Sequence, residues 1–189
     1  MKKRLLMGVC ALTTAMMLFV GCGANVGKEN NINNNGDQIN QTITVTDVRG
    51  NVEIPAEPQR IVDLSGNSDI LALLGYKVVG TANSDAYDYT KFPTYLEDTL
   101  NGATILGYSM QDTMDVEAIM NLDPDLIVIS TVQEKMYDQL SDIAPTVMIQ
   151  LEALDWKEDV KAFAKVFNKE VQAETWLEKY ENMAEAAGE

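Results

Sequence analysis

The sequence predicts an α/β domain with a mostly parallel sheet covered by helices on both faces. After residue 41, short segments of almost continuously apolar residues recur along the chain, a pattern typical of strands buried on both faces. Between them lie polar turns and segments whose apolar residues follow helical spacing. Strands that alternate with helices in this way favour a parallel sheet between two helical layers.

A hairpin and one buried strand are expected first. Segment 42–54 alternates β-branched and polar residues around Arg49-Gly50-Asn51, which predicts a β-hairpin with its turn there. Pro55 and Pro58 end it, because proline lacks the amide hydrogen that a strand ladder needs. The apolar segment 60–64 is expected to be the next strand.

One helix and four further strands follow. The helix is expected to open at Asp69 and to stop at Gly75, a residue typical of helix C-termini. Its apolar face consists of Ile70, Leu71, Leu73 and Leu74. The strands are expected at 77–82, 103–107, 125–130 and 146–150.

The segment 114–130 predicts a short helix that leads directly into a buried strand. Val116, Ile119 and Met120 recur at helical spacing and are expected to form the buried face. Glu117 lies off that face in the first turn, where the helix dipole favours an anion. Asp123-Pro124 ends the helix, because the residue before a proline is disfavoured in helical conformation.

A long helix is expected at the C-terminal end of the sequence. It runs from Glu170 to Ala187, about 27 Å at 1.5 Å per residue, with Asn168 as its N-cap. Its apolar stripe consists of Ala173, Trp176, Leu177, Tyr180, Met183 and Ala184.

The first 41 residues predict export. A basic start and a short apolar run make residues 1–21 a signal peptide, too short for a membrane span. Phe19-Val20-Gly21-Cys22 resembles the lipobox of bacterial lipoproteins, so Cys22 is expected to be lipidated and to anchor the protein to the outer face of the cell membrane. A plain signal peptide or an uncleaved anchor are the alternatives. Residues 22–41, beginning with the lipidated cysteine, are a polar, flexible linker.

Composition and charge exclude several classes of function. Loss of the signal removes three positive charges and takes the formal charge from −15 to −18, so there is no basic footprint for nucleic acid. The chain has no histidine, and its cysteines are Cys10 and Cys22, which leaves no triad chemistry, zinc site or disulfide to expect. Asp123 and Asp125 suggest paired carboxylates, but alternate strand residues point to opposite faces. No enzymatic activity is expected.

Four segments in register carry a family resemblance. They are "VEIPAEPQRIVDL", "LLGYKVVG", "MDVEAIMNLDPDLIVIS" and "YDQLSDIAPTV". Together they resemble the ABC-transporter substrate-binding lipoproteins for ferric siderophores and cobalamin. Such proteins have two Rossmann-like lobes joined by a long helix, clamp the ligand between the lobes and deliver it to a permease. A glutamate on each lobe docks on the permease, and Glu117 occupies the position of the first-lobe glutamate.

The resemblance also implies a domain organisation. Residues 42–167 correspond to the N-terminal ligand-binding lobe, and 168–189 to the start of the interlobe helix. Nothing in the sequence corresponds to the second lobe, so we expect a fragment that binds ligand more weakly than a two-lobed relative. The apolar stripe of the last helix is expected to be exposed where the lobes would join.

Candidate ligand contacts lie in the loops after the strands, because open α/β sheets bind ligands beyond the carboxyl ends of their strands. These residues are aromatic, apolar or neutral hydrogen-bonding groups, which suit a bulky and partly apolar chelate. They are Ser65, Asn67, Asn83, Ser84, Tyr87, Tyr108, Ser109, Met110, Thr131, Gln133 and Tyr137. The iron is expected to arrive wrapped in its siderophore, so no cofactor and no metal ligand of the protein are needed.

The charge of these loops favours one class of ligand. Lys91 and Lys135 are the nearest cations, too few for a strongly anionic catecholate siderophore. We therefore expect an uncharged ferric hydroxamate. The alternatives are cobalamin, or a surface interaction lobe without a small-molecule ligand.

Overall fold

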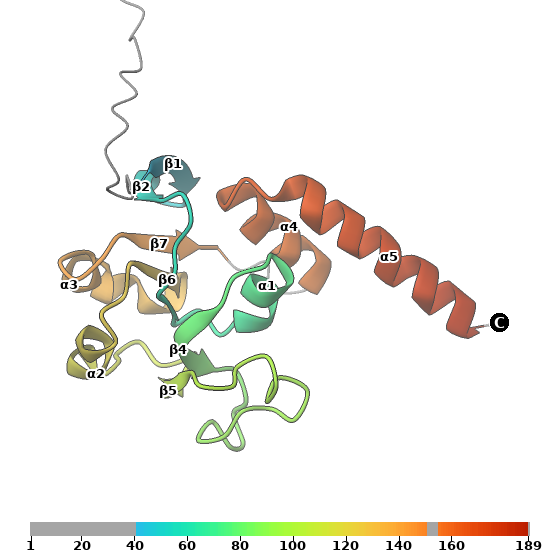
Figure 1. Cartoon of the computed structure of the whole chain (residues 1–189). Coiled ribbons are helices and arrows are strands. Elements are labelled where there is room, and N and C mark those ends of the chain that lie inside the picture. Colours follow the sequence, from blue (N-terminus) through green and yellow to red (C-terminus); the bar gives the residue numbers. More distant parts are fainter. Residues whose placement is uncertain (1–40, 151–154, 189) are drawn as a thin grey trace, which may run out of the picture. The chain divides into compact units, whose positions relative to one another are not determined.

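The computed structural model describes residues 41–150 and 155–188, which form a five-stranded sheet, a two-stranded hairpin and the surrounding helices (Figure 1). The predicted signal peptide, Cys22 and all but the last residue of the predicted linker lie outside the described residues. Within the described part, no helix combines the length and the apolar character needed to cross a bilayer.

The five-stranded sheet is parallel throughout, as the sequence predicts, in the order β5-β4-β3-β6-β7. Its strands are β3 (Ile61–Asp63), β4 (Val78–Asn83), β5 (Thr104–Tyr108), β6 (Leu126–Ser130) and β7 (Thr146–Ile149). The chain starts in the middle at β3, proceeds outward to β5, and returns to the other side of β3 with β6. The strand order therefore reverses between β3 and β6, which is where ligands bind in open α/β sheets.

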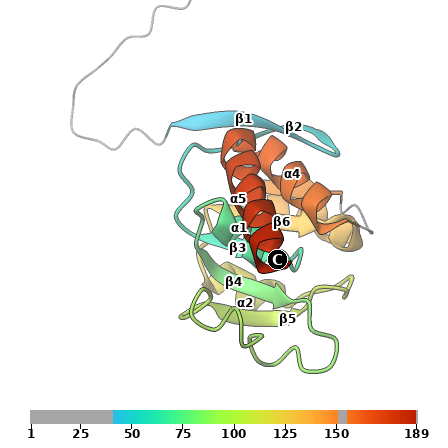
Figure 2. The same ribbon diagram turned by 90° about the vertical axis from the view of Figure 1, so that its right-hand side faces the viewer.

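Helices cover both faces of the sheet. They are α1 (Ser68–Leu73), α2 (Val116–Asn121), the 3₁₀ helix η1 (Thr131–Met136), α3 (Tyr137–Ser141), α4 (Trp156–Val166) and α5 (Glu170–Gly188). In β6, Leu126 and Val128 pack in the core with α1, α4 and α5, whereas Ile127 and Ile129 pack with α2 and α3. The continuous apolar run thus reflects burial on both faces. In Figure 2, α4 and α5 run alongside each other on one side of the sheet.

The hairpin, β1 (Thr42–Asp47) and β2 (Gly50–Pro55), turns one residue earlier than expected. Asp47 pairs with Gly50, so the connection is Val48-Arg49, and Asn51 already belongs to the strand. The Asp47 carboxylate fixes this turn, because its Oδ1 accepts hydrogen bonds from the backbone amides of Arg49 (2.7 Å) and Gly50 (3.1 Å).

The buried face of α2 differs from the expectation at one position. Ile119 is fully buried, but Met120 is 57% exposed. Leu122, three residues after Ile119, packs in the core instead, so the short helix presents a narrower apolar stripe than expected. Asp115 caps the helix by accepting a hydrogen bond from the amide of Ala118 at 3.0 Å.

Asn168 ends α4 and is not the N-cap of α5. Its φ is +54°, its amide donates to the Lys165 carbonyl (3.4 Å), and the Lys169 amide donates to the Ala164 carbonyl (2.7 Å). This pair of bonds is a Schellman motif, in which asparagine can take the left-handed position. Helix α4 itself, as well as η1 and α3, was not among the elements expected from the sequence.

The apolar stripe of α5 is partly covered by α4. Ala173 and Leu177 are buried in the same core cluster as Phe163, so the expectation of a fully exposed stripe is wrong. Trp176 and Tyr180 stay partly exposed at 37% and 42%, and both rings contact Trp156 at the start of α4.

Candidate functional site

Loops from the carboxyl ends of β3, β4 and β5 meet at one edge of the sheet. Gly66, after β3, has a φ of +83°, and a Cβ added to it would lie 2.5 Å from Ser109 Oγ and 3.6 Å from Ser84 Cβ. Ser84 follows β4 and Ser109 follows β5. The three loops thus bring the predicted ligand contacts Ser84 and Ser109 close to Gly66. The short distance between Gly66 and Ser109 requires a residue without a side chain at position 66.

A fully buried carboxylate holds the loop between β3 and α1. Asp63 Oδ1 accepts from the amide (2.9 Å) and hydroxyl (2.6 Å) of Ser65, and Oδ2 accepts from the amide of Asn67 (3.1 Å) and the hydroxyl of Ser68 (2.6 Å). Ser68 Oγ also lies 2.7 Å from Thr81 Oγ1 on β4. Burial raises the pKa of Asp63, and the hydrogen bonds from Ser65 and Ser68 partly offset that effect. The Ser65 hydroxyl therefore stabilises the loop through its hydrogen bond to Asp63.

Asn83 organises the long connection between β4 and β5. Its buried side-chain amide donates to the carbonyls of Tyr89 (2.9 Å) and Lys91 (2.8 Å). Its backbone carbonyl accepts a hydrogen bond from the backbone amide of Ser109 at 2.8 Å. Asn83 thus joins the end of β4 to both the excursion that follows it and the loop after β5.

Gln133, in η1, joins the loop after β6 to the loop after β5. Its Oε1 accepts from the amide (3.1 Å) and hydroxyl (3.0 Å) of Ser130. Its Nε2 donates to the carbonyls of Ser109 (2.5 Å) and Gln111 (3.0 Å). The residue is fully buried, so this side chain is part of the scaffold at the site.

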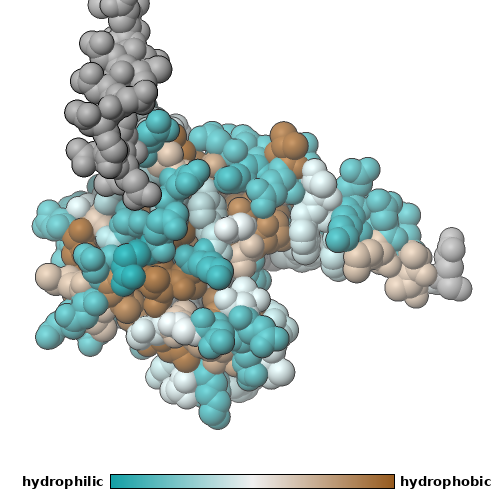
Figure 3. Space-filling view, in the orientation of Figure 1, coloured by the Kyte–Doolittle hydropathy of each residue, from teal (hydrophilic) through white to brown (hydrophobic). Residues whose placement is uncertain are grey.

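Aromatic and apolar side chains form the accessible part of the site. Tyr108 is half-buried and stacks on Tyr89, with ring centroids 5.8 Å apart and an interplanar angle of 27°. Tyr87 is fully exposed and Met110 is 59% exposed. The space-filling view shows the opposite side of the molecule, where the strands begin, and the apolar side chains gathered there beside β4 are therefore a patch separate from these loops (Figure 3).

Three cations at or beside these loops are each paired with an aspartate. Lys91 Nζ lies 2.8 Å from Asp88 Oδ2, and Lys135 Nζ lies 3.1 Å from Asp112 Oδ2. On the hairpin, Arg49 lies 3.7 Å from Asp138 Oδ1, with its guanidinium 4.0 Å above the ring of Tyr137. Backbone bonding of Val48 to Met148 brings the hairpin tip to the carboxyl half of β7.

The structure divides the predicted site residues into two groups. Exposed or half-buried residues, able to meet a ligand, are Asn67, Ser84, Tyr87, Tyr108, Met110, Thr131 and Tyr137. Buried residues bonded within the protein are Ser65, Asn83, Ser109 and Gln133. Sequence reasoning missed Tyr89 and Arg49. The cluster of tyrosines between residues 84 and 103 signalled Tyr89, whereas no local signal reveals the pairing of the hairpin tip with β7.

The acidic residues outside these loops have structural roles or surface positions. Asp125 lies at the amino end of the strands, where its carboxylate accepts from the amides of Gln59 (2.7 Å) and Arg60 (2.8 Å). Glu117 is exposed in the first turn of α2. Within residues 41–150 and 155–188, no group of three or more His, Cys, Asp and Glu side chains is arranged to hold a metal ion.

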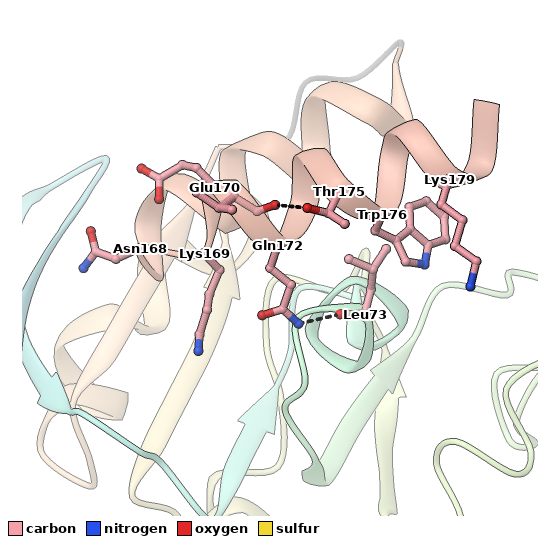
Figure 4. Close-up of a pocket in the computed structure, with 9 residues that line it drawn as sticks. Leu73, Asn168, Lys169, Glu170, Gln172, Thr175, Trp176 and Lys179 are labelled. Carbon is pink, nitrogen blue, oxygen red and sulfur yellow. Dashed lines mark hydrogen bonds between the residues drawn. The ribbon is translucent and has the colours of Figure 1, made fainter. Parts of the chain in front are cut away.

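Two surface hollows lie beside α5. One of about 580 Å³ lies between α1 and the first turns of α5, where Gln172 Nε2 donates to the Leu73 carbonyl at 3.2 Å (Figure 4). A second of about 480 Å³ is lined by residues of α1, α4 and α5 and by Leu96, and it includes Asn67 from the loop after β3. Apart from Asn67, the predicted contacts do not line these hollows.

An open parallel sheet whose strand-end loops present aromatic and neutral polar groups defines a small-molecule binding lobe. The chain belongs to the periplasmic binding protein family, whose model matches residues 64–189.

Relatives and solved structures agree with this assignment. The chain is 36% identical to the iron(3+)-hydroxamate-binding protein FhuD of Bacillus subtilis, over 78% of this chain and 44% of the relative. It is also 36% identical to the probable siderophore-binding lipoprotein YfiY of the same organism, over 89% and 50%. The crystal structure of Staphylococcus aureus SirA complexed with staphyloferrin B matches with a TM-score of 0.62 and 38% sequence identity. The match covers 75% of this chain and 47% of SirA. The chain thus spans about half the length of the relatives it matches.

Proposed function

We propose that this protein captures a ferric siderophore, of the hydroxamate type, and delivers it to the permease of an ABC importer. The observation that carries this proposal is the accessible part of the candidate site, here called its rim. It holds the stacked rings of Tyr89 and Tyr108, and its two lysines, Lys91 and Lys135, are each already paired with an aspartate. Membership of the periplasmic binding protein family and similarity to FhuD and YfiY support it.

The aromatic surface suits a bulky chelate whose iron is already fully coordinated. Tyr108 and Tyr89 offer a stacked pair of rings that can contact the apolar parts of such a ligand. Ser84, after β4, and Thr131, after β6, are exposed and provide hydroxyl groups for its polar atoms. Because the siderophore supplies every iron ligand, the protein needs only to recognise the outside of the chelate.

The charge of the rim favours an uncharged ligand. A ferric hydroxamate of low net charge needs no cluster of free cations, whereas an anionic siderophore does. Similarity to SirA, which was crystallised with staphyloferrin B, makes a carboxylate siderophore the second candidate. These two classes differ in charge, so direct binding separates them.

Export and docking complete the proposal. Lipidation of Cys22 would hold the protein at the outer face of the membrane, close to the permease. Glu117 is exposed in the first turn of α2, where it is free of the core and available for a charge-assisted contact with a basic permease residue.

Isothermal titration of the purified protein with ferrichrome, ferrioxamine B, ferric staphyloferrin B and cobalamin tests the proposal. We expect the two hydroxamates to bind more tightly than the other two. Tyr108→Ala should weaken hydroxamate binding by about 1–3 kcal/mol, a typical loss for a buried aromatic contact. Tyr95→Ala, in an exposed tyrosine of the same β4–β5 connection, is the matched control. Preference for staphyloferrin B or cobalamin, or equal effects of both substitutions, would contradict the proposal.

A further inference from the structure

We propose that Gln133 and Asn83 are positioning residues that hold Tyr89 and Tyr108 as a preformed platform, and that neither contacts the ligand. The inference rests on the proposed function for the nature of the ligand that this platform receives. Both side chains are buried, Gln133 completely, while the two tyrosine rings reach the surface.

The bonding of Gln133 leaves nothing for a ligand. A side-chain amide has two donor hydrogens and an acceptor oxygen with two lone pairs. Ser130 fills the oxygen with its amide and its hydroxyl, and the carbonyls of Ser109 and Gln111 fill the two donor positions. Removing the donors would leave the Ser109 and Gln111 carbonyls of the β5–α2 loop without this partner, which is costly above all for the buried bond to Ser109.

These bonds fix one half of the platform. Tyr108 directly precedes Ser109, so the Gln133 bond to the Ser109 carbonyl anchors the backbone beside the Tyr108 ring. The backbone amide of Ser109 is anchored as well, because it donates a hydrogen bond to the backbone carbonyl of Asn83 at 2.8 Å. Ser109 is thereby held from both sides.

Asn83 fixes the other half. Its side chain donates to the carbonyls of Tyr89 (2.9 Å) and Lys91 (2.8 Å), which pins the excursion at the residue that carries the second ring. The connection between β4 and β5 runs from residue 84 to residue 103, a length at which loops without regular structure are commonly mobile. An excursion pinned before binding avoids the entropy loss of ordering it on the ligand.

Isosteric substitutions of the full chain separate positioning from general stability. Gln133→Glu keeps the acceptor for Ser130 and removes both donors, and Gln133→Met removes all four bonds without adding a buried charge, in case the glutamate variant does not fold. Asn83→Asp removes the donors to Tyr89 and Lys91. Asp125→Asn is the matched control, because it weakens a clamp between distant segments at the opposite end of the strands.

Amide hydrogen exchange of the ligand-free protein is the first readout. We expect the Ser109 amide to exchange at least ~10-fold faster in the Gln133 variants, and the Tyr87 and Thr90 amides of the β4–β5 connection to do so in the Asn83 variant, with amides of β6 and β7 unchanged. The Asp125 variant should leave Ser109 unchanged relative to these strands. Unchanged exchange of Ser109 in the Gln133 variants would overturn the positioning role of Gln133, and unchanged exchange of Tyr87 and Thr90 in the Asn83 variant would overturn that of Asn83. An increase shared by all strands would overturn both.

Titration with ferrichrome is the second readout, and we expect binding about 10-fold weaker in the Gln133 and Asn83 variants. Unchanged affinity together with faster Ser109 exchange would overturn the claim that the platform receives the ligand. If the unaltered protein binds no ferric hydroxamate, the proposed ligand class is wrong, and the exchange data still decide whether Gln133 and Asn83 hold the two tyrosines.

Discussion

Replacing Gly66 by alanine tests how closely the strand-end loops pack. Gly66 has a φ of +83°, and holding an alanine in left-handed conformation costs about 1–2 kcal/mol. The added Cβ would also lie 2.5 Å from Oγ and 2.6 Å from Cβ of Ser109, far inside normal van der Waals separation. The substitution therefore adds a steric conflict to the backbone strain.

Ser109 cannot easily withdraw from this conflict. Its amide donates to Asn83 and its carbonyl accepts from Gln133, so a shift would break hydrogen bonds in a buried region. Overpacking of this kind costs about 1–3 kcal/mol. With the backbone strain of about 1–2 kcal/mol, Gly66→Ala should lower the free energy of unfolding by about 2–5 kcal/mol.

Urea unfolding followed by far-UV circular dichroism measures this loss. Gly102→Ala is the matched control, because Gly102 has a φ of +89° and a Cβ added there would meet no heavy atom within 4 Å. It should lose about 1–2 kcal/mol, from backbone strain alone. If Gly66→Ala is no more destabilising than Gly102→Ala, the close approach of Gly66 to Ser109 does not exist in solution.

Three further predictions concern the anchor, the docking surface and the rim charges. Cys22→Ser should move the protein from the membrane fraction to the soluble fraction, and persistent membrane association would contradict lipidation. Glu117→Ala should reduce siderophore uptake in cells without changing ligand affinity, and an equal loss of affinity would reject the docking role. Hydrogen bonds from Lys91 and Thr90 lower the pKa of Asp88 to about 2, so Lys91→Met should raise it toward 3.8 in an NMR titration. A carboxyl group whose pKa is lowered on folding stabilises the folded state at pH values above its unfolded pKa, and this stabilisation is lost as the pH falls toward 2. Between about pH 4 and pH 2 the Lys91→Met variant should therefore lose less stability than the unaltered protein.

The strands were predictable because burial on both faces leaves a direct mark on the sequence. β6 reads as an uninterrupted apolar run, and the structure places its alternate residues in two different cores. Helix α4 left an equally clear mark, since Val160, Phe163, Ala164 and Phe167 follow helical spacing and are all buried. That signal was present in the sequence and was missed.

One half of the bonding of Gln133 was also visible in the sequence. Ser130-Thr131-Val132-Gln133 has the Ser-x-x-Gln spacing of a capping box, and the structure shows the reciprocal bonds of that motif. A glutamine so placed directs its oxygen at the start of its own helix. Its donors to Ser109 and Gln111, by contrast, link residues more than twenty positions apart, and no local pattern reveals them.

Asn168 shows how a local rule can be applied at the wrong helix end. Asparagine is favoured both as an N-cap and as the left-handed residue after a helix. The sequence prediction placed a helix after Asn168 and none before it, so the N-cap interpretation followed. The bond from Lys169 to the Ala164 carbonyl assigns the residue to the end of α4.

The small number of cations in the loops predicts an uncharged ligand. The structure adds a different physical reason for the same preference, because each cation near the site is paired with an aspartate. Lys91, Lys135 and Arg49 are all close to the candidate site, and each has an aspartate within 4 Å. These pairs are solvent-exposed, so each contributes little stability and a ligand could displace the contact at small cost. The aspartate nevertheless remains nearby, because the backbone segments that carry the two charges stay next to each other when the side chains separate. A ligand therefore meets the sum of the two charges, and an anion gains little from the cation whether or not the ion pair itself survives.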